Sequence, residues 1–83
     1  MKSRNIKING CYTCKEVTVF IDYNPENGNQ EVRVMATHHK DKKEVVQMGW
    51  LGYFFPHDVE AEKMLNHYSP KMAVKFANSI PIF

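Results

Sequence analysis

Cys11 and Cys14, in the stretch "NGCYTCKEV", are separated by two residues, a spacing that can support chemistry. Such a pair supplies half of a zinc site or the two thiols of a redox centre, or it only marks a tight turn. Redox pairs are typical of a helix N-terminus, where the helix dipole lowers the pKa of the first thiol. The residues after Cys14, "KEVTVF", read as a strand instead. The pattern therefore favours ordinary thiols at the mouth of a hairpin, with a zinc site as the alternative.

Zinc would require two further ligands, because a structural zinc ion is four-coordinate. The chain offers His38, His39, His57 and His67. Adjacent residues of a strand point to opposite faces, so at most one of His38 and His39 can join the two cysteines. His57 and His67 lie farther apart in the sequence than the usual histidine pair of a zinc finger. We therefore expect no cofactor, and keep a zinc ion bound by the cysteine pair as an alternative.

A basic segment, "HHKDKKE" at residues 38–44, contains Lys40, Lys42 and Lys43 with few acidic neighbours. We interpret it as a turn between two strands, with Arg33 on the preceding strand extending its positive charge. Such a turn could bind phosphates or an acidic protein surface. Alternatively, it is only a solvated turn whose lysines discourage aggregation at the strand ends.

An aromatic segment, "GWLGYFFP", follows and includes Trp50 and Tyr53. Aromatic side chains stack on nucleic-acid bases, anchor protein interfaces or fill a small core. Trp50 shares a strand face with Met48 and Val46, so we expect it to lie in the core. Successive residues of a strand point to opposite faces, so at least one ring of this segment is a candidate for exposure and for contact with a partner.

Catalytic motifs are not visible in the sequence. It has no nucleophile elbow, no glycine-rich phosphate loop and no HExxH pattern. A cysteine and a histidine distant in sequence could form a nucleophile and its base, but nothing in the sequence requires that pairing. We therefore predict that the protein is not an enzyme.

Length and composition describe a single small domain over residues 1–83. The chain has 43% hydrophobic and 24% charged residues and a net charge of +2, which is too small for a protein that binds nucleic acid by charge alone. The longest mostly apolar run, "MGWLGYFF", is far shorter than the about 20 residues of a membrane span. Two cysteines make no disulfide framework, and we expect a cytoplasmic protein without membrane contact.

Alternating apolar residues predict strands over residues 15–23 and 31–38, and β-branched and aromatic residues predict another over 45–55. A shorter strand at 5–8 would precede them, closed by a turn at Asn9-Gly10. Helices are predicted from about 58 to 68, after a capping Asp58, and from Ser69-Pro70 to about Asn78. The expected fold is α+β, an antiparallel meander of three to four strands followed by two C-terminal helices packed on one face.

These observations favour a small non-enzymatic interaction protein that binds and modulates or inhibits a larger protein or nucleoprotein, of the kind encoded by phages or mobile elements. The contact residues would come from the basic turn and the exposed aromatics. A nucleic-acid-binding domain that uses Arg33, Lys40, Lys42 or Lys43 for phosphates and Trp50 or Tyr53 for stacking is the alternative. The C-terminal "IPIF" would fold back on the domain or form a homodimer contact.

Overall fold

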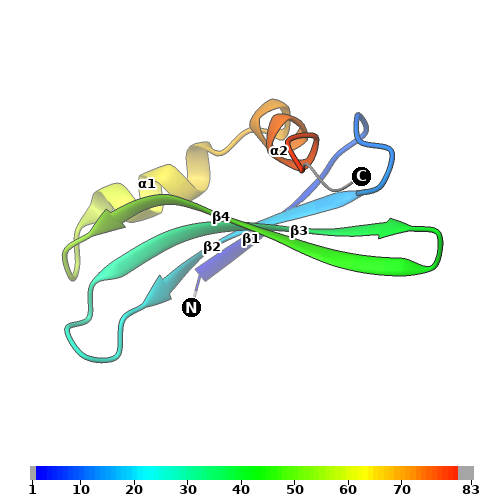
Figure 1. Cartoon of the computed structure of the whole chain (residues 1–83). Coiled ribbons are helices and arrows are strands. Elements are labelled where there is room, and N and C mark those ends of the chain that lie inside the picture. Colours follow the sequence, from blue (N-terminus) through cyan, green and yellow to red (C-terminus); the bar gives the residue numbers. More distant parts are fainter. Residues whose placement is uncertain (1, 81–83) are drawn as a thin grey trace.

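The computed structural model of the chain describes residues 2–80 and has four strands followed by two helices (Figure 1). The strands form one antiparallel sheet in the order β1-β2-β3-β4. This confirms the predicted α+β meander with C-terminal helices. Most of the "IPIF" segment lies outside the described residues. The elements are β1 (Lys2–Lys7), β2 (Glu16–Tyr23), β3 (Gln30–Lys40), β4 (Lys43–Phe54), α1 (Val59–His67) and α2 (Pro70–Ala77).

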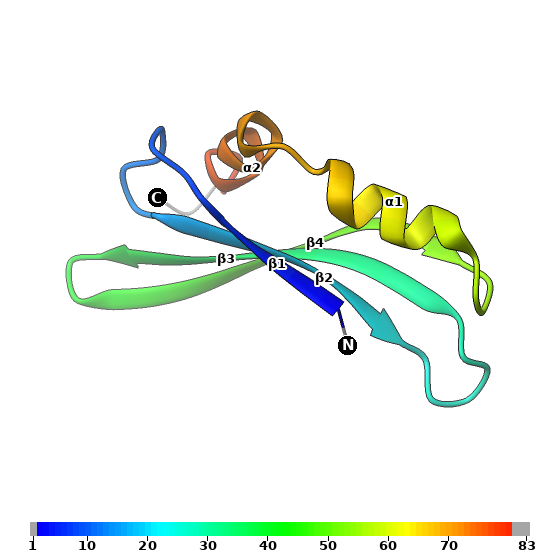
Figure 2. The same cartoon turned by 180° about the vertical axis from the view of Figure 1, so that it is seen from behind.

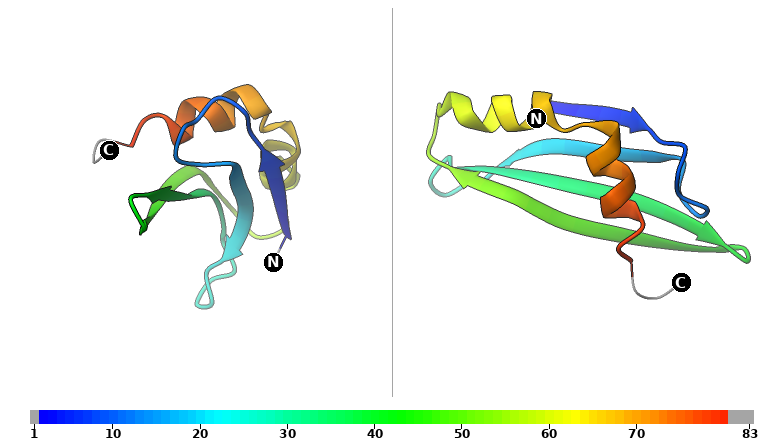
Figure 3. Two further views of the ribbon diagram at one scale, coloured as in Figure 1. Left: turned by 90° about the vertical axis from the view of Figure 1, so that its right-hand side faces the viewer. Right: turned by 90° about the horizontal axis from the view of Figure 1, so that it is seen from above.

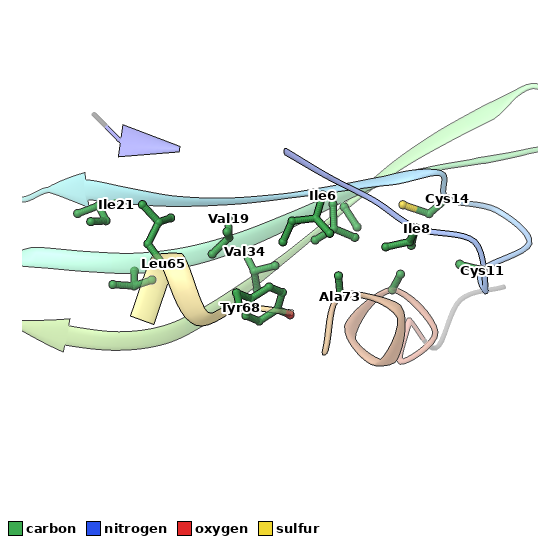
Figure 4. Packing of buried hydrophobic residues seen from close by; sticks show 14 of the residues in the cluster. Ile6, Ile8, Cys11, Cys14, Val19, Ile21, Val34, Leu65, Tyr68 and Ala73 are labelled. Carbon is green, nitrogen blue, oxygen red and sulfur yellow. The ribbon is translucent and has the colours of Figure 1, made fainter. Parts of the chain in front are cut away.

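Both helices lie on the same face of the sheet, and the opposite face carries no element of the described chain (Figures 1 and 2). The covered face takes alternate residues of the two central strands, which are fully or almost fully buried because period-2 alternation sends them all to one side. These residues are Val17, Val19, Ile21, Val32, Val34 and Ala36. Figure 4 shows this layer meeting Leu65 of α1 and Ala73 of α2.

The turn between β3 and β4 is much shorter than the sequence suggested. Strand pairing continues to Lys40 and resumes at Lys43, so that only Asp41 and Lys42 form the turn. Their φ angles of 52° and 66° are the positive pair that a two-residue hairpin of right-handed twist requires. The interpretation of residues 38–44 as one loop is therefore wrong, and His38 and His39 belong to β3.

A β-bulge interrupts the pairing of β3 with β4. Val32 pairs with Gly52 and Arg33 with Trp50, so Leu51 is the extra residue on β4. The extra residue lies between Gly49 and Gly52. Gly49 and Leu51 both face the helices, and beyond Leu51 the bulge shifts the alternation, so that Trp50 and Tyr53, three residues apart, lie opposite Arg33 and Glu31 on the same face.

The two helices begin at the predicted caps. The Asp58 carboxylate accepts from the amide of Glu60, and the Ser69 hydroxyl accepts from the amide of Met72, with Pro70 in the first turn of α2. Ala61 and Leu65 of α1 and Ala73 and Ala77 of α2 are buried, as their spacing indicates. Met72, in the first turn of α2, is 49% exposed.

Helix α2 approaches β4 closely because β4 has no side chain at Gly49. A Cβ atom at this position would lie 2.8 Å from Cε1 of Phe76 and 3.1 Å from Cγ1 of Val34. The phenyl ring of Phe76 therefore rests on the backbone of the strand. This contact requires glycine for space rather than for backbone conformation, since a positive φ is found at Gly28 and not here.

Arg4 of β1 holds the C-terminal end of α1. Its Nη1 donates to the carbonyl of Leu65 at 2.7 Å and to that of Tyr68 at 3.1 Å. These carbonyls lie at the end of a helix, where a positive charge is favourable. The neighbouring Lys2 reaches the same helix through an exposed ion pair with Glu62.

Replacing Arg4 should therefore destabilise the fold more than replacing Lys2. We expect Arg4→Met to lower the free energy of unfolding by about 1 to 3 kcal/mol, because two carbonyls lose a charged donor. Lys2→Met should cost less than about 1 kcal/mol, as is usual for exposed ion pairs. Urea unfolding of both variants measures the difference, and equal costs would contradict this role of Arg4.

Candidate functional site

The uncovered face of the sheet, called the open face below, is the candidate site. It is formed by the strand residues that alternate with the buried ones, and Figure 3 shows it below the sheet on the side away from the helices. Several large side chains on it are exposed because no helix covers them. Trp50 is 52%, Val46 55%, Tyr53 67% and Met48 37% exposed. Exposed apolar side chains that adjoin one another mark interaction surfaces.

Arg33 lies at the centre of the open face between two aromatic rings. Strand register places Phe20 of β2, Arg33 of β3 and Trp50 of β4 side by side. The guanidinium carbon is 4.9 Å from the centre of the Trp50 ring and 5.9 Å from that of Phe20. Cation–π contacts of this kind contribute about 0.5 to 2 kcal/mol. They hold the exposed Trp50 ring against the sheet.

One further contact fixes Arg33. Its Nη1 donates to Oδ2 of Asp22 at 3.2 Å, which orients the guanidinium along the sheet. Its Nε is shielded from solvent and has no hydrogen-bond partner among residues 2–80. The guanidinium thus lies between two aromatic rings and uses only some of its hydrogen-bond donors.

The charge of the open face is not positive. Its strand residues include more acidic than basic side chains, because the face combines Lys7 and Arg33 with Glu16, Asp22, Glu31 and Glu44. Arg33 is moreover already paired with Asp22. A phosphate backbone approaching this face would meet repulsion from carboxylates, whereas a protein surface of mixed polarity would not.

Two shallow depressions adjoin each other on the open face. One, of about 280 Å³, is lined by Ser3, Thr18, Phe20 and Met35. The other, of about 370 Å³, extends from Thr18 and Met35 toward Thr37 and His39. Together they form a hollow in the middle of the face beside Trp50 and Tyr53, called the aromatic ridge below. A protruding side chain of a partner could enter them.

The structure brings together only some of the predicted contact residues. Arg33, Trp50 and Tyr53 share the open face. The expectation that Trp50 lies in the core is wrong, since both helices cover the other face and leave Trp50, Met48 and Val46 exposed.

The basic turn is separate from this group. Lys40, Lys42 and Lys43 are exposed at the tip of the β3–β4 hairpin. Seven residues of β3 separate Arg33 from Lys40, a distance of about 23 Å at the usual rise per strand residue. Arg33 therefore does not extend the basic turn, contrary to the sequence interpretation.

Phe20, Met35 and Asp22 were not singled out from the sequence although they belong to the site. The signal for Phe20 was present, because it alternates with the buried Val19 and Ile21 and must face away from them. The same signal was present for Met35, which alternates with the buried Val34 and Ala36.

The two cysteines lie in the loop between β1 and β2 and are both buried free thiols. Burial raises the pKa of the Cys14 thiol, whose Sγ donates to the carbonyl of Glu16 at 3.1 Å. The sulfur of Cys11 is 3.7 Å from Oγ1 of Thr13. Within residues 2–80, no three cysteine, histidine or acidic side chains gather as metal ligands do. Each thiol thus has a protein partner of its own.

His38 is fully buried and belongs to a chain of hydrogen bonds that starts near Cys11. Its Nδ1 lies 2.7 Å from Oγ1 of Thr13, and its Nε2 lies 2.8 Å from Oε1 of Gln47. The Gln47 amide donates in turn to the carbonyl of Phe76 at 2.9 Å. Because the Gln47 amide nitrogen donates to Phe76, its oxygen must accept from Nε2 of His38, and Nδ1 shares the other hydrogen bond with the Thr13 hydroxyl.

This chain joins β3, β4, the β1–β2 loop and the end of α2. Within the chain, Thr13 stands between the thiol of Cys11 and the imidazole of His38. A nucleophilic thiol requires its base within hydrogen-bond reach. The arrangement is therefore suited to holding the far end of the fold together.

Comparisons with protein-family models, with curated proteins and with solved structures give no match. The site must therefore be interpreted from its own geometry. No helix within residues 2–80 is both long and apolar enough to cross a membrane.

His38 and His39 provide a matched test of the buried hydrogen-bond chain. We expect His38→Ala to lower the free energy of unfolding by about 2 to 4 kcal/mol, because it opens a cavity and removes the imidazole that bonds Oγ1 of Thr13 and Oε1 of Gln47. His39→Ala, on the exposed face of the same strand, should change it by less than about 0.5 kcal/mol. Thermal or urea unfolding measures both, and similar small effects would contradict the structural role of His38.

The zinc alternative is tested by metal analysis. Zinc binds thiolates, and the hydrogen-bonded Cys14 thiol with its raised pKa keeps its proton near neutral pH. We expect excess EDTA to leave the unfolding temperature of the untagged protein unchanged. One zinc per chain by elemental analysis, together with a fall in that temperature on chelation, would overturn this expectation.

Proposed function

We propose that the chain is a small non-enzymatic interaction protein that binds a larger protein through the open face and thereby modulates its activity. The observation that carries the proposal is the exposed Trp50 ring, which Arg33 holds in place on a face that no helix covers. Tryptophan, tyrosine and arginine are the residues that most often dominate the binding free energy of protein interfaces. Trp50, Tyr53 and Arg33 are grouped on this face.

The charge of the open face supports a protein partner over a nucleic acid. Aromatic rings beside an arginine could stack on bases, but binding single strands also needs a positive groove that follows the phosphates. Glu16, Asp22, Glu31 and Glu44 lie on the same face. The lysines of the hairpin tip are too distant to compensate them at the aromatic ridge.

The proposed site of action is the cytoplasm. Both cysteines are free thiols, as is usual in a reducing compartment. The proposal assigns no chemical step to the protein, because the shallow depressions of the open face have no nucleophile and base in contact on their linings. The expected result of binding is that the partner surface beneath the open face becomes inaccessible to its other ligands.

Partner capture with matched variants tests the proposal. The tagged chain recovers proteins from a native host extract, and the recovered candidate is purified and titrated against the chain. We expect Trp50→Ala to weaken that binding by about 30-fold or more, as for a central hot spot. Tyr12→Ala is the control, because Tyr12 is 94% exposed in the loop between β1 and β2.

Trp50 also supplies a direct signal, since it is the only tryptophan of the chain. Its fluorescence should shift to shorter wavelength and become protected from acrylamide when the purified partner is added. Equal affinity of the Trp50→Ala variant, or unchanged fluorescence at saturation, would contradict the proposed surface. Recovery that nuclease abolishes, with affinity falling steeply with salt, would support the nucleic-acid alternative instead.

A further inference from the structure

Strand β4 forms one edge of the sheet and is unusually long (Figure 3, right). It has 12 residues, about twice the usual length of a strand. A free edge presents a row of unpaired N–H and C=O groups, and proteins normally protect it with charged residues, proline or very short strands. Whether β4 is protected depends on which of its backbone groups point away from the sheet.

Hydrogen bonds on the other side of β3 determine this direction. The amide of His39 donates to the carbonyl of Thr13, on the β2 side of β3. Backbone groups alternate in direction along a strand, so those of His38 point toward β4, as do those of every second residue before it. These residues pair with Val45, Gln47 and Gly49 of β4.

It follows that Val46, Met48 and Trp50 direct their N–H and C=O groups outward from the edge. The same three side chains are exposed on the open face. Among residues 2–80 the edge thus has no pairing strand along the segment where its side chains are also apolar.

The two edges of the sheet differ in their protection. Strand β1 carries Lys2, Arg4 and Lys7 among its six residues. Strand β4 has no charged residue and no proline after Glu44, through its end at Phe54. One edge therefore has the composition that prevents strand addition, and the other has the composition that permits it.

We propose that β4 pairs antiparallel with β4 of a second copy of this chain, about a two-fold axis at Met48. In this register Met48 lies opposite Met48 of the second copy, and Val46 lies opposite Trp50 of the second copy, in both directions. Each of these hydrogen-bonded pairs exchanges two backbone hydrogen bonds. The two open faces become one continuous surface with an unbroken apolar row along the junction.

Self-complementarity is the reason for choosing a second copy as the occupant. An isologous interface must match its own residues, and this register puts no charge against an apolar side chain. A shift of two residues toward the turn would place Glu44 against Met48 on the open face. The bulge at Leu51 disfavours a shift in the other direction, because it breaks the regular spacing of the edge.

Engineered disulfides test both the dimer and its register. Cα atoms of a hydrogen-bonded antiparallel pair are about 5.5 Å apart, which suits a disulfide. We expect Met48→Cys to form a covalent dimer under mild oxidation, whereas Ser3→Cys, exposed on the opposite edge, should not. A mixture of Val46→Cys and Trp50→Cys should cross-link more than either variant alone.

Oligomeric state provides the second readout. Sedimentation equilibrium of the unmodified chain at about 100 µM should give twice the mass of 9.7 kDa. Met48→Lys, which places a charge on the axis, should be monomeric with an unchanged circular dichroism spectrum. A monomeric unmodified chain, or cross-linking of Ser3→Cys as efficient as that of Met48→Cys, would overturn the proposal whether or not a larger partner is found.

Discussion

The fold depends on one constraint, which is that two short helices can cover only one face of the sheet. Helices α1 and α2 have nine and eight residues, and both lie against the same side of the four strands (Figure 2). The hydrophobic effect therefore selects one alternating set of strand residues for burial and leaves the other in contact with water. The valines of β2 and β3 meet this requirement, and Phe20, Met35 and Trp50 are what the other face retains.

Burial on the covered face changes character along the sheet. Beside α1 the contacts are aliphatic, with Ile21 against Leu65, and near the centre Val19 and Val34 meet Tyr68 (Figure 4). Toward α2 the contacts become smaller and more polar. There Gln47 binds the carbonyl end of the helix and continues to His38 and Thr13. A buried polar chain with its groups satisfied fixes geometry that alanines alone would leave loose.

The parts of the fold that depend on local signals could be predicted from the sequence, and those that depend on distant contacts could not. Helix caps and the alternation of β2 are local signals, and they gave correct elements. The orientation of β4 was wrong because its outward set, Val46, Met48 and Trp50, is more apolar than its inward set, which includes Gln47 and Gly49. Only the approach of α2 and the partner of His38 make glutamine and glycine the inner residues, and neither is visible locally. Of the site, Trp50, Tyr53 and Arg33 were identified by residue type, whereas the only signal for Phe20 was its alternation with Val19 and Ile21.

Arg33 holds the exposed aromatic side chains of the open face in place. Its guanidinium lies between Phe20 and Trp50 and is tied to Asp22, so the rings are held in one arrangement while polar atoms remain among them. A side chain that is already ordered loses less conformational entropy on binding than a mobile one. Trp50 combines such ordering with 52% exposure. Val46 and Met48, its neighbours on β4, are exposed as well, and their backbone groups point outward from the edge of the sheet. The proposed contacts with a partner protein and with a second copy therefore both involve β4.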